Sequence, residues 1–147
     1  MTLDDEIRRK ILQLPDTPEI IDDWDFIVGE LSDDFRWIGS KIDWEKTIDH
    51  KYSELHGGYS DWLGTIKCFI KDNKINNLIS KSNEIFYIND SSLDFSVRLN
   101  NDQFYHFLSL AVNDIPQHHY FFERKSKWCL VISSEGYIDF GFSPKIA

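Results

Sequence analysis

The stretch KWCLVISSEGYIDFGF, from Lys127 to Phe142, has the pattern of a β-hairpin. Two alternating apolar segments flank the residues SSEG, which favour a type I turn followed by a left-handed residue, a position that glycine fills most easily. This turn places Ser133 opposite Tyr137. The resulting register pairs large apolar side chains on one face: Trp128 with Phe142, Leu130 with Phe140, and Ile132 with Ile138. Because a slip by one residue would move this whole set to the other face, the pattern predicts a single register.

The other face of this hairpin carries Cys129 and Asp139, and His118 or His119 lies on the strand predicted before it. A Cys–His–Asp catalytic arrangement is therefore conceivable. However, neither a glycine-rich elbow nor a helix N-terminus adjoins Cys129 to lower its pKa or to hold an oxyanion. We therefore predict an inert, buried cysteine. A small enzyme or ligand-binding domain that uses the sheet face around His119, Cys129 and Asp139 remains the alternative.

The rest of the chain predicts an α+β fold in one domain over residues 1–147. Helices are expected over residues 3–14, over 19–31 (with a strand over 26–31 as an alternative), over 43–55 behind an Asp43 cap, and as two short helices within 59–82. Strands are expected over 85–88, 93–99 and 118–123, with a turn at 89–92 and a helix capped by Asn100 or Asn101. The prediction is N-terminal helices packed on a C-terminal antiparallel sheet of ββαβββ order.

Composition narrows the functional classes. The chain has 147 residues, 41% hydrophobic and 15% aromatic, as expected for a packed globular domain. Its first segment is charged and lacks a signal-type apolar stretch, and both cysteines, Cys68 and Cys129, have apolar neighbours. These features predict a cytoplasmic protein with reduced, buried thiols. The net charge of −9 disfavours nucleic acid and anionic membranes as direct partners.

Motifs for catalysis and cofactor binding are missing from the sequence. It contains no GxGxxG, phosphate loop, HExxH or GxSxG motif. His50 and His56 are six residues apart, and His118 and His119 point to opposite faces of a strand, so neither pair has metal-ligand spacing. We therefore predict a protein that is not an enzyme and has no metal site and no cofactor.

The acidic segment from Asp16 to Asp34 is the main functional candidate. It holds eight acidic residues and no Lys or Arg, and aromatic residues lie within it and directly after it. A solvated acidic face over core aromatics is the simpler interpretation. A binding surface is the other, because a cationic partner would relieve the repulsion and aromatics are common contact anchors. The predicted partner-binding residues are Asp22, Asp23, Trp24, Asp25, Asp33, Asp34, Phe35 and Trp37, although Trp24 and Trp37 are equally compatible with a core position.

Residues 93–142, which include HHYFFERKSKWCLVISSEGYIDFGF, resemble bacterial immunity proteins of polymorphic toxin systems, of the contact-dependent growth inhibition type. The resemblance lies in an aromatic strand, a Trp-containing strand, a Ser-Glu-Gly turn and an Asp-Phe-Gly strand. It implies a cytoplasmic, non-catalytic protein that neutralises a cognate toxin domain, often a nuclease, and nucleases are basic because they bind phosphate. No binding residue is transferred by this resemblance. Mimicry of nucleic acid by the acidic segment is a third possibility.

Overall fold

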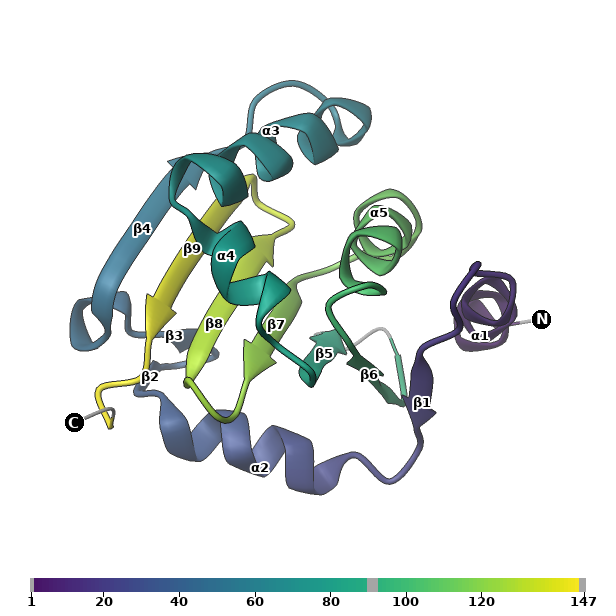
Figure 1. Cartoon of the computed structure of the whole chain (residues 1–147), viewed down its shortest axis with the longest axis horizontal. Coiled ribbons are helices and arrows are strands. Elements are labelled where there is room, and N and C mark those ends of the chain that lie inside the picture. The colour runs from purple at the N-terminus through teal and green to yellow at the C-terminus, as the bar shows by residue number, and fades with distance from the viewer. Residues whose placement is uncertain (1, 90–92, 146–147) are drawn as a thin grey trace.

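The predicted hairpin forms two neighbouring strands of a seven-stranded antiparallel sheet in the computed structural model, which describes residues 2–89 and 93–145 (Figure 1). Strands β8 (Trp128–Ser133) and β9 (Tyr137–Phe142) pair in the predicted register, with Ser133 opposite Tyr137. Gly136 has a φ of +98°, the left-handed conformation expected at this position of the turn. The hairpin prediction is confirmed.

The sheet has the strand order β1-β6-β5-β7-β8-β9-β4. Its other strands are β1 (Glu19–Ile21), β4 (Ile48–Glu54), β5 (Ile85–Asn89), β6 (Ser96–Leu99) and β7 (His119–Glu123). Every neighbouring pair is antiparallel. The protein therefore has an α+β fold with a large antiparallel sheet, to which the N-terminal half contributes both edge strands.

Helices cover the first face of the sheet. They are α1 (Leu3–Leu12), α3 (Tyr59–Asp72), α4 (Ile75–Ser80) and α5 (Phe104–Asp114). They pack on the inward side chains of the hairpin and of the strands beside it, Tyr87 and Phe121 among them. The Thr2 hydroxyl accepts a hydrogen bond from the Asp5 backbone N–H at 3.1 Å, so α1 begins at the predicted cap.

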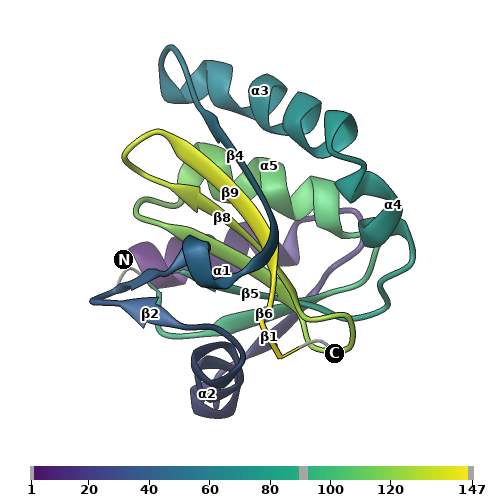
Figure 2. The same ribbon diagram turned by 90° about the vertical axis from the view of Figure 1, so that its left-hand side faces the viewer.

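A smaller layer covers the second face (Figure 2). It consists of α2 (Asp25–Asp34), a small hairpin of β2 (Trp37–Ile38) and β3 (Lys41–Ile42), and the 3₁₀ turn η1 (Trp44–Lys46). Ile27, Leu31 and Phe35 pack there on Phe86, Phe122 and other residues of the sheet. The central strands are consequently buried on both sides.

Two helix predictions are wrong. The segment after Asp43 forms η1 and then β4, because its backbone pairs with β9. A register shift between Ile48 and Lys51 puts Ile48 opposite Phe142 and Tyr52 opposite Asp139, so the helical spacing of the two residues does not correspond to one face of the strand. The segment 19–31 begins as β1, where Ile20 pairs with Val97, and α2 starts only at Asp25. The alternative strand over 26–31 is also wrong.

The remaining helix predictions hold, with changes at their ends. Two helices, α3 and α4, occupy 59–82 as predicted. Helix α5 starts one turn later than the expected cap, while the Asn100 side chain accepts from the Gln103 backbone N–H at 2.9 Å. The predicted turn at 89–92 lies, apart from Asn89, outside the described residues. Within residues 2–89 and 93–145, no helix has the length and apolar character needed to cross a membrane.

Candidate functional site

The two tryptophans predicted as contact anchors, Trp24 and Trp37, line one cavity of about 400 Å³ on the second face of the sheet. We call this cavity the tryptophan pocket. Its walls come from α2, the β2–β3 turn, β5 and β7. The other lining residues are Val28, Leu31, Ser32, Gly39, Ser40, Ile88, Asn89 and Tyr120.

Helical spacing builds the first wall. Trp24 stands directly before α2, and its carbonyl accepts the backbone N–H groups of Ile27 and Val28 at 3.0 and 3.3 Å. Val28 and Ser32 follow at intervals of four residues, so they lie on the same side of the helix as Trp24. Ile27 and Leu31 are buried in the core of the second face, and Leu31 also lines the pocket. Thus one side of α2 packs on the sheet, and the adjacent side, with Val28 and Ser32, lines the pocket.

The β2–β3 hairpin builds the opposite wall. Trp37 pairs across this hairpin with Ile42, which is buried, and both pack on the second face of the sheet. The rings of Trp37 and Tyr120 lie 6.1 Å apart with an angle of 39° between their planes. The indole Nε1–H of Trp37 is shielded from solvent and has no acceptor within the part of the chain that the structure describes. Both tryptophans are therefore partly buried, and each serves the core and the pocket together.

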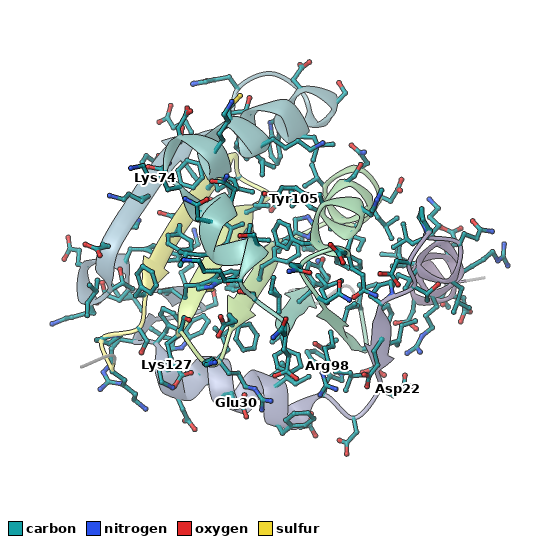
Figure 3. The ribbon with its side chains drawn as sticks, in the orientation of Figure 1. Asp22, Glu30, Lys74, Arg98, Tyr105 and Lys127 are labelled. Atoms are coloured by element: carbon teal, nitrogen blue, oxygen red, sulfur yellow. The ribbon has the colours of Figure 1, made fainter. Side chains whose placement is uncertain are left out.

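The acidic segment has more cationic partners than its sequence suggests. Lys and Arg residues from other elements reach four of its eight carboxylates. These ion pairs are Asp22 with Arg8 (2.7 Å), Glu19 with Arg98 (3.2 Å), Glu30 with Arg124 (2.8 Å) and Asp34 with Lys127 (3.1 Å). In Figure 3, Glu30 and Lys127 lie along α2, and Asp22 and Arg98 lie beside β1. The other four, Asp16, Asp23, Asp25 and Asp33, are exposed and have no ion-pair partner among the described residues.

Two of the predicted contact residues are held inside the structure. Phe35 is 2% exposed and belongs to the core below α2, so its ring offers no surface to a partner. The Asp34 side chain is 14% exposed next to Lys127, and its carbonyl accepts the hydroxyl of Ser143. Trp24 and Trp37 are partly exposed and line the tryptophan pocket. Asp23 and Asp25 are exposed on either side of Trp24 in the chain, and Asp33 is exposed on α2.

The alternative catalytic set does not converge. His119 lies opposite Ile132 and faces the first layer of helices, whereas Cys129 lies opposite Phe122 on the second face. Burial, reinforced by the negative charge of Asp139, raises the pKa of the fully buried Cys129 thiol well above its ordinary value. A protonated, inaccessible thiol is a poor nucleophile. The prediction that both thiols are buried is wrong for Cys68, which is exposed.

Asp139 belongs to a second, smaller cavity of about 130 Å³, which it lines together with His118 and Lys41. Its carboxylate bonds to Nε2 of His50 at 2.7 Å, and the His50 ring stacks on Trp44 at 5.1 Å. Burial raises the Asp139 pKa, an effect that the hydrogen bond with His50 partly offsets. The sequence did not suggest His50, because its segment was assigned to a helix. Cys129 is not among the described residues that line this cavity.

Val28, Ser40 and Tyr120 are pocket residues that the sequence did not single out. Alternation along HHYFFE places Tyr120 on one face of a strand, but no sequence signal shows what covers that face. No group of three or more His, Cys, Asp or Glu residues in the described ranges is arranged to hold a metal ion.

No protein-family model, curated protein or solved structure matches the chain.

Proposed function

We propose that this protein is an immunity protein that binds a cognate toxin domain and neutralises it without catalysis. The observation that supports this function best is the tryptophan pocket, which Trp24 and Trp37 line together, with the exposed Asp23 and Asp25 on either side of Trp24 in the chain. Partly buried aromatics that also face a cavity have the properties of interface anchors, because they are large and already ordered. The toxin-system resemblance of residues 93–142 supports the same function.

The charge distribution supports a basic partner, for which a nuclease is the leading candidate. Asp23, Asp25 and Asp33 are exposed and form no ion pair within residues 2–89 and 93–145, while the paired carboxylates connect α1, α2 and the sheet. Free surface carboxylates accelerate encounter with a basic partner and favour its correct orientation. Mimicry of nucleic acid is less well supported, because four of the eight carboxylates already bind the protein's own cations.

The same proposal includes a cytoplasmic location, action as one domain over residues 1–147, and no cofactor. It also includes the predicted architecture of N-terminal helices packed on a C-terminal antiparallel sheet of ββαβββ order. The cytoplasmic location is what the resemblance implies, and the other properties rest on the length, motifs and periodicity of the sequence.

The decisive experiment is capture of the toxin domain. If the neighbouring gene encodes a large secreted toxin, its purified C-terminal domain is mixed with this protein and the complex is isolated by affinity chromatography. We expect a one-to-one complex in which the toxin's activity is lost. A toxin domain that neither binds nor loses activity would rule out this pairing and, if no other toxin binds, the function.

Charge reversal locates the interface. Asp23→Lys with Asp25→Lys should weaken the complex by about tenfold or more, because two favourable long-range interactions become repulsive. Asp102→Lys is the matched control, since Asp102 is exposed next to α5, on the other face of the sheet. Equal affinity for all variants would exclude the acidic segment as the interface while leaving the function intact.

A further inference from the structure

Three aromatic side chains from three separate segments meet at the tryptophan pocket: Trp24 before α2, Trp37 on β2 and Tyr120 on β7. We propose that this pocket binds one cationic side chain, an arginine or a lysine, of the protein's partner. The partner's identity rests on the proposed function, whereas the chemistry of the pocket does not.

The aromatic lining is held in place before any ligand arrives. Backbone hydrogen bonds from Ile27 and Val28 hold Trp24 at the start of α2. Pairing across the β2–β3 hairpin holds Trp37, and the Tyr120 hydroxyl donates to the Ser40 carbonyl at 3.5 Å. Ordered rings lose little conformational entropy on binding, so the pocket is suited to selective recognition.

Aromatic faces attract cations through their quadrupole, and this protein uses that interaction elsewhere. The guanidinium of Arg8 lies 4.4 Å from the ring centroid of Phe95, and that of Arg124 lies 5.0 Å from the Phe86 centroid. Within residues 2–89 and 93–145, neither Trp24 nor Trp37 has an internal cation over its ring. No described cation of the protein therefore competes for these two rings at the pocket.

Charge complementarity favours a cation over an apolar occupant. Among the described residues, the lining of the pocket contains no Lys or Arg, and Asp23 and Asp25, which flank Trp24 in the chain, have no ion-pair partner there. Carboxylates this close to a pocket residue attract a cationic side chain through space and give an apolar side chain no such attraction. The neighbouring cavity around Asp139 differs in this respect, because its own Lys41 disfavours a second cation.

The experiment is a titration of the whole ¹⁵N-labelled protein with acetyl-arginine methylamide, followed through the indole N–H signals. The matched probe is the citrulline derivative, which has nearly the same shape and no charge. We expect arginine to shift the Trp24 and Trp37 signals with an affinity about fivefold or more above that of citrulline, and added salt to weaken it. Equal affinities, or arginine-dependent shifts confined to Trp44, would overturn the assignment.

Variants separate the aromatic from the ionic contribution. Trp37→Leu keeps the wall of the pocket apolar but removes the aromatic ring, so arginine binding should be lost. Trp44→Leu is the control and should leave arginine binding unchanged. If Trp37→Leu does not fold, Asp23→Asn with Asp25→Asn provides the test: arginine affinity should fall by about threefold or more relative to Asp102→Asn. Unchanged affinity in the double Asp variant would contradict the proposal.

Different results would refute the proposed cation pocket and the proposed immunity function. Arginine that shifts the pocket tryptophans in a protein that binds no toxin domain would leave the pocket assignment valid and refute the proposed function. A toxin complex that forms normally with Trp37→Leu, together with no preference for arginine over citrulline, would refute the pocket assignment and leave the proposed function valid.

Discussion

His119 is a histidine buried between the sheet and its helical layer. Its Nδ1 shares a hydrogen bond with the Tyr87 hydroxyl at 2.7 Å. Burial, with a smaller contribution from the positive charge of His118, lowers the pKa of His119 to about 4. The folded protein therefore keeps this imidazole neutral at pH values where an exposed histidine is already protonated.

This difference predicts a loss of stability in mild acid. Above pH 6.5 the imidazole is neutral in both the folded and the unfolded protein, so its titration does not lower the free energy of unfolding. As the pH falls from 6.5 to 4, the unfolded chain binds a proton that the folded protein excludes, which costs up to about 3 kcal/mol. Urea unfolding of His119→Gln should show a shallower decline over this range than the parent protein. His106→Gln, at an exposed position, should follow the parent, and a parent-like decline in His119→Gln would contradict the assignment.

Gly136 is the residue whose backbone conformation the hairpin turn requires. A Cβ built there would lie 3.5 Å from the Leu55 carbonyl, an ordinary contact, so steric crowding is not the obstacle. The φ of +98° is unfavourable for an alanine, and Gly136→Ala should lower the free energy of unfolding by about 1–2 kcal/mol. Gly64→Ala within α3 is the control and should be neutral or stabilising, because nothing lies within 4 Å of its Cβ and alanine favours a helix. Equal effects on chemical denaturation would show that the turn tolerates a side chain.

Among the elements, α2 depends most on contacts that are remote in sequence. Its last turn is held by Lys127, whose ammonium group lies 3.1 Å from Asp34, and its middle by Arg124 through Glu30. Both cations come from the end of β7 and the turn before β8. These contacts attach α2 to the second face of the sheet and so position one wall of the tryptophan pocket.

Removing the charge of Lys127 should therefore lower the free energy of unfolding more than removing the charge of an exposed lysine. Lys127→Gln leaves the largely buried Asp34 carboxylate without its cation and should destabilise the protein by about 1–2 kcal/mol. Lys41→Gln breaks the ion pair with Glu135, in which both side chains are more than half exposed, and should change stability by less than about 0.5 kcal/mol. Thermal unfolding of the two variants at equal ionic strength makes the comparison. A larger effect for Lys41→Gln would contradict the role given to Lys127.

For the whole molecule, the net charge of −9 predicts how a basic partner is found. The association rate constant with the toxin domain should fall by about tenfold between low and physiological salt, because screening removes the attraction between the separated proteins. Trp37→Leu should act mainly on the dissociation rate, since it removes contact and leaves the long-range field unchanged. Stopped-flow mixing measures both constants. An association rate independent of salt would argue against electrostatic steering.

The hairpin from Lys127 to Phe142 could be predicted in detail because its information is local. The turn residues select the loop geometry, and the alternation of apolar residues selects the register, so neither needs distant parts of the chain. The helices over 3–12, 59–80 and 104–114 could be predicted for the same reason, since each carries its own apolar periodicity. The acidic segment was recognisable as well, because an excess of one charge is a property of composition.

Long-range pairing determined the rest of the fold. Ile48–Glu54 has a pattern compatible with a helix and becomes a strand because β9 leaves an edge of backbone groups for it to pair with. The core position of Phe35 and the cations beside Asp22, Glu30 and Asp34 depend on contacts between separate elements, with Arg124 lying 94 residues from Glu30 and Lys127 lying 93 residues from Asp34. The opposite orientations of His119 and Cys129 likewise follow from the pairing of β7 with β8. Local sequence thus set the hairpin, the central helices and the sign of the surface charge. Packing across the sheet brought Trp24, Trp37 and Tyr120 together, because no local pattern relates three segments that meet only when the second layer closes on the sheet.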